Sequence, residues 1–312
     1  MSEKTGLVPP RPTASAYEQA EAQTAAAANS AAAAGTTPAP APAKRSADTA
    51  AASAAAKKPG ELFSAAIKQQ LGVVFGRMTR PVTLVLELDD TPLSTELQGF
   101  IGEMVALSNG KLNSVAVDAA GGVTHEGGSS RCTEPLAVTL PDGAELPVYG
   151  SLDDSGRAQF DVSGVLPSAR PVVRMCVPAE NSDAGTLLFT GLAFHGVPSG
   201  HEFNSFVLGM QGQPLDDDLK ARAEAIDTPI DVMILVSLTC TMCPETVLAA
   251  QRIASLNPNV RAEAYDVAHF PELKDQYGAM SVPCIVINHP GGEQKVEFGK
   301  KSVPQMLTLL GA

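Results

Sequence analysis

The segment SLTCTMCPET, from Ser237 to Thr246, places two cysteines three positions apart, between an apolar run and a proline. This spacing fits a redox-active dithiol, half of a zinc site, or two inert thiols. The apolar run DVMILVS (231–237) predicts a buried strand, and apolar residues recur at helical spacing after Cys243. Both cysteines are therefore expected at a junction where a strand ends and a helix begins.

Such a junction suits thiol–disulfide exchange, which requires a thiolate although a free cysteine is mostly protonated at neutral pH. The unpaired amide hydrogens and the partial positive charge of a helix N-terminus lower a thiol pKa. Pro244 fits the first helical turn, where no backbone donor is missed. We expect Cys240 to be the exposed attacking thiol, and Cys243 to be the resolving thiol, shielded within the first turn.

A zinc site would need further ligands for which the sequence shows no pattern. No second C-x-x-C and no close Cys-His pair is present, so Cys284, His269 and His289 could contribute only by accident of folding. We therefore favour a redox pair and expect no metal. A zinc site, an inert pair and, least of all, an iron–sulfur site are the alternatives.

Length and charge narrow the class of protein. The chain has 312 residues, enough for two domains, and a net charge of -12. Phosphate backbones repel such an acidic chain, which argues against nucleic acid as a partner. The apolar runs are too short to span a bilayer, no secretory signal is evident, and five unevenly spaced cysteines do not suggest a secreted scaffold. We expect a cytoplasmic protein that does not bind membranes.

The chain divides into a low-complexity tail and two similar halves. Residues 1–58 are rich in Ala, Pro, Ser and Thr and are predicted to be disordered, either as a solvated tail or as a tether for a partner. Residues 213–312 predict the order helix, strand, helix, strand, helix, two antiparallel strands, helix, which is the thioredoxin arrangement. Residues 59–212 predict a degraded copy with a Gly-rich polar insertion at about 119–165. The predicted fold class is α/β, with two tandem thioredoxin-like folds.

A second signature lies in MSVPCIVIN (280–288). Thioredoxin-fold oxidoreductases place a cis proline before their third strand, facing the cysteines, and Pro283 stands at that point after Val282. A cis X-Pro bond exposes backbone that can pair with an incoming peptide. Val282 and Pro283 are therefore the predicted substrate-docking residues. The alternative is an ordinary trans proline that opens a strand.

From about residue 62 to 312 the sequence resembles the N-terminal domain of the alkyl hydroperoxide reductase flavoprotein. The matching stretches are IKQQLGVVFGRMTRPVTLVLELDD (67–90), GHEFNSFVLGM (200–210), SLTCTMCPETVLAAQRIASLNPNV (237–260) and GAMSVPCIVIN (278–288). That domain is two fused thioredoxin folds, of which only the second keeps the cysteine pair. The resemblance implies a thiol–disulfide oxidoreductase that binds no cofactor itself. Its implied partners are a flavoprotein disulfide reductase, which would carry FAD and use NAD(P)H, and a peroxiredoxin.

The resemblance also implies roles for single residues. Glu202 matches a glutamate that is thought to handle the protons of the redox pair, although a surface glutamate near a helix start is the alternative. His201 is expected to pack or to cap rather than to catalyse. Pro171 matches a vestigial cis proline in the first half, where LDDTPLST (88–95) stands in place of a cysteine pair.

Three features depart from the family pattern. The chain ends at Ala312 without a dinucleotide-binding fingerprint, so electrons are expected from a separate reductase. The insertion carries Cys132 and is expected to be a surface excursion. Cys284 directly follows Pro283, where the family usually has a small residue, and is expected to be either a buried structural thiol or a third redox sulfur. Cys176, in an apolar strand, is predicted to lie in the core.

The leading hypothesis is a disulfide carrier between the reductase and the peroxiredoxin. The alternatives are a general glutaredoxin-like protein disulfide oxidoreductase and a non-catalytic interaction module. A redox titration separates the module from the others, because a module would show no potential in the range of roughly -300 to -180 mV that cellular exchange proteins occupy.

Overall fold

The computed structural model describes residues 62–117, 123–126, 137–139, 145–147, 169–178, 187–257, 259–289 and 293–312. The predicted disordered tail (1–58), most of the predicted insertion and Cys132 lie outside the described residues.

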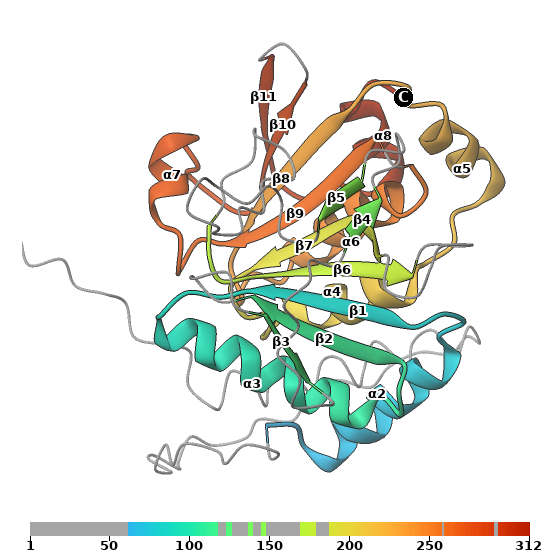
Figure 1. Cartoon of the computed structure of the whole chain (residues 1–312). Coiled ribbons are helices and arrows are strands. Elements are labelled where there is room, and N and C mark those ends of the chain that lie inside the picture. Colours follow the sequence, from blue (N-terminus) through green and yellow to red (C-terminus); the bar gives the residue numbers. More distant parts are fainter. Residues whose placement is uncertain are drawn as a thin grey trace, which may run out of the picture.

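The helices that the sequence predicts for residues 213–312 are present in the expected order, and the described part of residues 59–212 forms three more. They are α2 (Ala65–Arg77), α3 (Pro92–Leu107), α4 (Glu202–Gln211), α5 (Asp217–Glu224), α6 (Cys243–Ala254), α7 (Glu272–Gln276) and α8 (Val303–Leu309) (Figure 1). Local capping explains several starts: Ser64 accepts from the Ile67 amide at α2, and Thr91 accepts from the Ser94 amide at α3. No helix in the described part of the chain is long and apolar enough to cross a membrane.

The strands form one continuous sheet. They are β1 (Val82–Glu87), β2 (Leu112–Val117), β3 (Val123–Glu126), β4 (Ala137–Thr139), β5 (Glu145–Pro147), β6 (Val172–Pro178), β7 (Leu187–His195), β8 (Ile230–Val236), β9 (Val260–Asp266), β10 (Cys284–Asn288) and β11 (Gln294–Phe298). Among the described residues their order is β11-β10-β8-β9-β7-β6-β1-β2-β3, and β4 pairs with β5 and β7. The predicted insertion therefore contributes strands to the sheet.

The strand pairing shows the duplication that the sequence suggested. In the second half, β8 is parallel to β9 and antiparallel to β10, which is antiparallel to β11. In the first half, β1 is parallel to β2 and antiparallel to β6, which is antiparallel to β7. The halves join where β7 pairs in parallel with β9. The α/β class with two thioredoxin-like folds is confirmed, while the boundary at residue 212 stays a prediction because the sheet runs through both halves.

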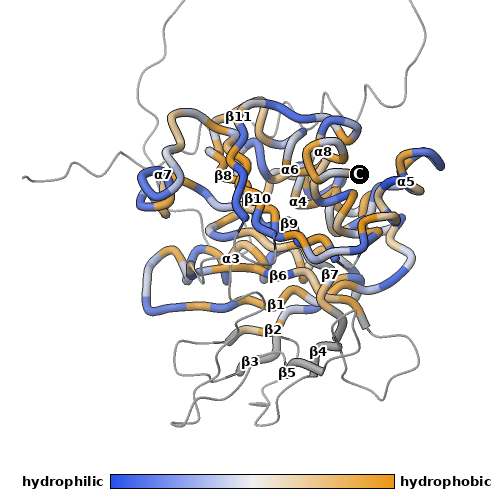
Figure 2. The backbone as a smooth tube through the Cα atoms, turned by 90° about the horizontal axis from the view of Figure 1, so that it is seen from above, coloured by the Kyte–Doolittle hydropathy of each residue, from blue (hydrophilic) through white to orange (hydrophobic). Residues whose placement is uncertain are grey.

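The two faces of the sheet carry different cores. Residues of α2, α3, α4, α6 and α8 pack on one face, which receives Val232, Ile234 and Val236 of β8. Met233 and Leu235 point to the other face, into a smaller core that includes residues of α7. Figure 2 shows the hydrophobic colour along β8 and β10 near the centre and hydrophilic colour on parts of α5 and α7. Successive residues of a strand face opposite sides of the sheet, so only every second residue of β8 and its neighbours can lie on the face that carries the cysteine pair.

A buried cluster of charged side chains lies on the second face, where the halves join. Arg174 of β6 donates from Nε to Glu87 of β1 at 2.7 Å and from Nη1 to Glu263 of β9 at 2.9 Å. His195 Nε2 of β7 lies 2.8 Å from Glu263 Oε2, and the Tyr265 hydroxyl donates to the same oxygen at 3.2 Å. Burial alone would raise the pKa of Glu263, but the Arg174 charge and the His195 hydrogen bond lower it to about 2. The cluster therefore ties the two halves together electrostatically.

Candidate redox site

The cysteine pair lies at the predicted junction of a strand and a helix. Residues 237–242 connect the end of β8 to α6, which begins at Cys243. The Cys240 amide donates to the Ser237 carbonyl at 2.9 Å, and Pro244 lies in the first turn of α6. The apolar run that precedes Ser237 forms a fully buried strand, so it anchors the loop that presents the cysteines.

The two thiols differ in exposure in the way that their predicted roles require. Cys240 is half-buried, whereas Cys243 is 0% exposed, and neither forms a disulfide in the structure. Burial raises the pKa of the Cys243 thiol well above its ordinary range. A hydrogen bond with Cys240 and the charge of Glu202 raise it further, against a hydrogen bond with the Ser237 backbone. Cys243 must therefore lose a proton before it can attack a mixed disulfide.

The predicted docking loop faces the attacking thiol. The Val282–Pro283 bond is cis, which confirms the expectation from the sequence. The Cys240 Sγ lies 3.8 Å from the carbonyl oxygen of Val282. A partner segment that approaches Cys240 would therefore meet the backbone of Val282 at the same time.

The first half keeps a cis proline but has lost the thiols. The Arg170–Pro171 bond is cis, as the resemblance implied for Pro171. At the end of β1, where a cysteine pair would stand, the Asp89 carboxylate accepts from the Ser94 and Thr91 hydroxyls at 2.5 Å each. The thiol that the structure describes in this half, Cys176, is fully buried in β6, as predicted. These groups offer no accessible sulfur for exchange.

Glu202 is not a surface residue, so that alternative is wrong. Its side chain is 0% exposed at the start of α4. The turn that precedes Glu202 contacts Leu238, in the loop that carries Cys240. Gly200 has φ +58, and a Cβ there would lie 2.5 Å from the Leu238 carbonyl oxygen. The His201 amide also donates to that oxygen at 2.9 Å. Glu202 is thus fastened to the segment that carries Cys240.

The carboxyl group of Glu202 has one satisfied and one unsatisfied oxygen. The Ser205 hydroxyl donates to Oε2 at 2.5 Å, whereas Oε1 has no hydrogen-bond partner among the described residues. Burial raises the pKa of Glu202 to about 8, against the hydrogen bond from Ser205 and together with the charge of Asp266. A carboxyl group that titrates close to the range of thiols and interacts with Cys243 is suited to exchange a proton with it.

Asp266 also belongs to this site, although the sequence analysis did not single it out. Ala262 and Ala264 of β9 contact the helical core that contains Cys243, and Asp266 continues this alternation. Asp266 is fully buried and pairs across the sheet with Val236, the last residue of β8. The sequence VRAEAYDV (260–267) already indicated this position, because strand alternation places Asp266 on the same face as Ala262 and Ala264.

Two further residues can now be placed. Cys284 packs with Met233 and Tyr265 in the smaller core, on the opposite face of the sheet from Cys243, and burial raises its pKa to about 11. This placement favours a structural thiol. His201 occupies the N-cap of α4 and is half-buried, but its side chain makes no capping hydrogen bond; that it packs rather than catalyses stays a prediction.

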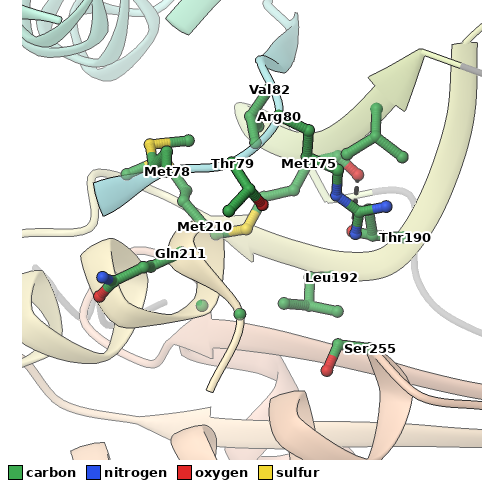
Figure 3. A pocket seen from close by; sticks show the side chains of 13 residues that line it. Met78, Thr79, Arg80, Val82, Met175, Thr190, Leu192, Met210, Gln211 and Ser255 are labelled. Atoms are coloured by element: carbon green, nitrogen blue, oxygen red, sulfur yellow. Dashed lines mark hydrogen bonds between the residues drawn. The ribbon is translucent and has the colours of Figure 1, made fainter. Parts of the chain in front are cut away.

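Away from the redox pair, the described residues form one small cavity that can be compared with a ligand pocket. No three of their His, Cys, Asp and Glu side chains gather closely enough to hold a metal ion. A cavity of about 50 Å³ is lined by residues that include Met175, Met210 and Ser255 (Figure 3). Ser255 follows α6 at the end opposite Cys243, so this cavity lies a helix length from the redox pair. It is also far smaller than the roughly 300 Å³ of a typical cofactor pocket.

Replacing Glu202 with Gln should slow exchange at neutral pH by about tenfold or more, because Gln cannot carry a proton. The substitution should also change how stability depends on pH. The pKa of Glu202 rises from an ordinary 4.5 to about 8 on folding. Its contribution to stability is therefore full below about pH 4.5 and is lost as the pH rises towards 8. Relative to the wild type, the variant should gain roughly 1 kcal/mol per pH unit across this window.

Stopped-flow exchange and denaturant unfolding at several pH values measure the two effects. Because all other groups are shared, the difference between the two proteins isolates Glu202. A stability difference that does not vary with pH would mean that Glu202 ionises as in water.

The chain is similar in sequence to known redox proteins. Residues 230–307, which contain both cysteines and Pro283, match the family described as Thioredoxin domain. The chain is 34% identical over 155 residues to the alkyl hydroperoxide reductase AhpF of Pseudomonas aeruginosa, covering 45% of this chain and 30% of that protein. The chain spans about a third of the length of the curated relatives it matches.

Solved structures cover more of the chain. The NTD_N/C domain of alkylhydroperoxide reductase AhpF from Enterococcus faecalis is 33% identical with a TM-score of 0.58, covering 80% of this chain and 99% of that one. A protein disulfide oxidoreductase from Aeropyrum pernix K1 has a TM-score of 0.55 over 79% of this chain and 91% of that one. With 18% identity, the second similarity supports the fold alone.

Proposed function

Because the chain belongs to the family of the N-terminal domain of the alkyl hydroperoxide reductase AhpF, it is a thiol–disulfide oxidoreductase, and we propose that it carries electrons from a flavoprotein disulfide reductase to a peroxiredoxin. One observation supports the proposal above all. A half-buried Cys240 lies 3.8 Å from the carbonyl oxygen of Val282, next to a cis proline, while Cys243 is fully buried behind it. One sulfur can meet a partner, and the other can only reach its neighbour.

In the proposed cycle, the Cys240 thiolate attacks the disulfide of an oxidised peroxiredoxin, and one partner sulfur leaves as a thiolate. In the fraction of molecules whose Glu202 is ionised, Cys243 gives its proton to that carboxylate and then displaces the second partner sulfur from Cys240. The partner disulfide is reduced to a dithiol and the Cys240–Cys243 dithiol is oxidised to a disulfide, a transfer of two electrons. A dithiol of the reductase reverses the reaction, with electrons that pass from NAD(P)H through FAD on that partner.

The docking loop would align the partner during this exchange. An extended peptide can form backbone hydrogen bonds with an exposed strand or loop edge. In the proposed complex, the segment around the partner disulfide pairs with the backbone of Val282 and so brings its sulfur to Cys240. We also propose a cytoplasmic location, where cellular reductants keep such thiols reduced.

Reconstitution tests this proposal. NAD(P)H oxidation coupled to peroxide reduction is measured with this protein, a thioredoxin-reductase-like flavoprotein and a peroxiredoxin, with each left out in turn. We expect turnover only when all three are present. Undiminished turnover without this protein would remove the carrier role. Reduction of insulin disulfides but not of the peroxiredoxin would instead indicate a general disulfide oxidoreductase.

A further inference from the structure

The proposed cycle moves a proton off Cys243 in one direction and back in the other, yet this thiol has no contact with solvent. Cys243 and Glu202 are both 0% exposed. A proton passed from the thiol to Glu202 therefore remains buried unless another group takes it to the surface. Two residues outside the cysteine, cis-proline and Glu202 motifs stand in a position to do so.

Asp266 lies beside Gly196, in the loop that leads from β7 to Glu202, and His269 lies between Asp266 and solvent. Asp266 is fully buried, and its charge acts on Glu202. Its Oδ1 accepts from the Ala268 amide at 3.1 Å, whereas Oδ2 has no hydrogen-bond partner among the described residues. The His269 Nε2 lies 3.6 Å from that Oδ2, and the His269 side chain is 30% exposed.

The fold holds the imidazole beside the carboxylate. The amides of His269 and Phe270 donate to the Asp266 carbonyl at 3.0 and 3.1 Å, which closes a turn directly after β9. Gly196, with φ +102, packs on this turn, since a Cβ there would lie 3.6 Å from Asp266 Cβ and 3.7 Å from His269 Cδ2. The loop after β7 thus confines both side chains. The gap of 3.6 Å exceeds a hydrogen bond, so a small rotation of the part-exposed imidazole would close it.

We propose that Asp266 and His269 form the route by which the proton of Cys243 passes from Glu202 to solvent. The proton moves from Cys243 Sγ to the Glu202 carboxylate, then from the Glu202 acid to the Asp266 carboxylate. Asp266 passes it to Nε2 of His269, and His269 releases a proton from Nδ1 to water. The Cys243 thiolate displaces the partner sulfur, so one proton and one partner thiolate leave the protein.

The titratable groups that act on this route come from three segments. They are Glu202 of α4, Cys240 and Cys243 at the entry to α6, and His269 in the turn that follows Asp266. Burial raises the pKa of Asp266, against the Ala268 amide and the His269 charge, so its carboxylate can accept a proton transiently. The buried cluster around Glu263 lies on the opposite face of the sheet and takes no part.

This inference rests on the proposed exchange chemistry, and the two can fail separately. A small aromatic disulfide, dithiobis(nitrobenzoate), separates the two thiol steps without any protein partner. Attack of Cys240 on the reagent releases one coloured nitrothiobenzoate and leaves the other attached to Cys240 as a mixed disulfide. Cys243 then displaces that second nitrothiobenzoate from Cys240. The assay uses a Cys132→Ser background, which removes the thiol that lies outside the described residues. Cys176 and Cys284 are fully buried, so the coloured signal should come from Cys240 and Cys243.

In this assay His269→Ala should slow the second release by about tenfold or more at low buffer concentration and leave the first unchanged. Added imidazole should restore the second release. Asp266→Asn should slow the same step without rescue, because imidazole cannot reach Glu202. His289→Ala is the matched control, a histidine at the end of β10 whose amide bonds Glu293, and should change neither step.

An unchanged second release in His269→Ala, an equal slowing of both steps, or a slowed step that imidazole does not restore would overturn the route. These readings stand even if Asp266→Asn fails to fold. If both releases follow the expected pattern but reconstituted peroxide reduction fails, the peroxiredoxin proposal is wrong and the proton route is retained.

Discussion

Cys243→Ser should accumulate as a covalent complex with oxidised peroxiredoxin, whereas Cys240→Ser should form none. In the first variant Cys240 can still attack, but no sulfur remains to displace the partner. In the second variant the remaining Cys243 is 0% exposed, and burial keeps its pKa well above the usual range for a thiol. Both variants should lose peroxide turnover entirely, while each keeps a single folded state.

Non-reducing electrophoresis and mass spectrometry of each variant, incubated with oxidised peroxiredoxin, measure the trapped complex. A strong reductant should release it. Cys284→Ala is the control, because this buried thiol lies on the other face of the sheet and should be dispensable for turnover. Trapping by Cys240→Ser would reverse the two roles, and full turnover by both serine variants would end the redox interpretation.

Arg174→Met should cost about 3–5 kcal/mol of the free energy of unfolding, the range for removing one partner of a buried ion pair. Arg174 bonds Glu87 and Glu263 at 2.7 and 2.9 Å, and all three side chains are buried. Met has a similar length but removes the guanidinium that Glu87 and Glu263 share, which leaves Glu87 with Arg170 at 3.4 Å and Glu263 with His195 at 2.8 Å. The loss therefore comes from the stranded acids rather than from packing.

The pH dependence identifies that cause. In the wild type the pKa of Glu263 lies near 2, so its contribution is present above the ordinary 4.5 and is lost as the pH falls through 2. Without Arg174, burial should raise the pKa of Glu263 above 4.5 instead, so the variant should regain stability as the pH falls through the raised pKa towards 4.5. The deficit should thus be largest at neutral pH.

Guanidinium unfolding at pH 7 and pH 4 measures both expectations. Lys220→Met is the control, because Lys220 pairs with Glu224 at the surface and both side chains are about half exposed. It should lose about 1 kcal/mol or less. A loss of under about 1 kcal/mol in Arg174→Met, or one that is equal at both pH values, would show that the acids are not stranded.

The order of elements could be predicted because it rests on local patterns. DVMILVS and CIVIN have the length and composition of buried strands, and each forms one. The cis Pro283 and the burial of Cys243 also followed from segments close in sequence. These features need only the alternation of a strand, the start of a helix and a family motif.

The missed groups depend on contacts between distant segments. Glu87 lies 87 residues from Arg174, which lies 89 residues from Glu263, and nothing in either strand indicates that they pair. Glu202 was selected by resemblance alone. Its burial depends on Gly200, where an added Cβ would meet the carbonyl oxygen of Leu238. Strand alternation indicated the face on which Asp266 lies, but its place next to Val236 became visible only when β9 was paired with β8.

The parallel pairing of β7 with β9 determines whether the second half can be separated from the first half without exposing a strand edge. Residues 230–307 match the family described as Thioredoxin domain, and in this chain one edge of their strand β9 is covered by β7 of the first half. Cut free, that edge would present unpaired amides and carbonyls together with a Glu263 stripped of Arg174. Open edges of this kind recruit strands from other molecules and promote aggregation. Because the first half covers this edge of β9, we expect residues 230–307 on their own to aggregate more readily than the whole chain.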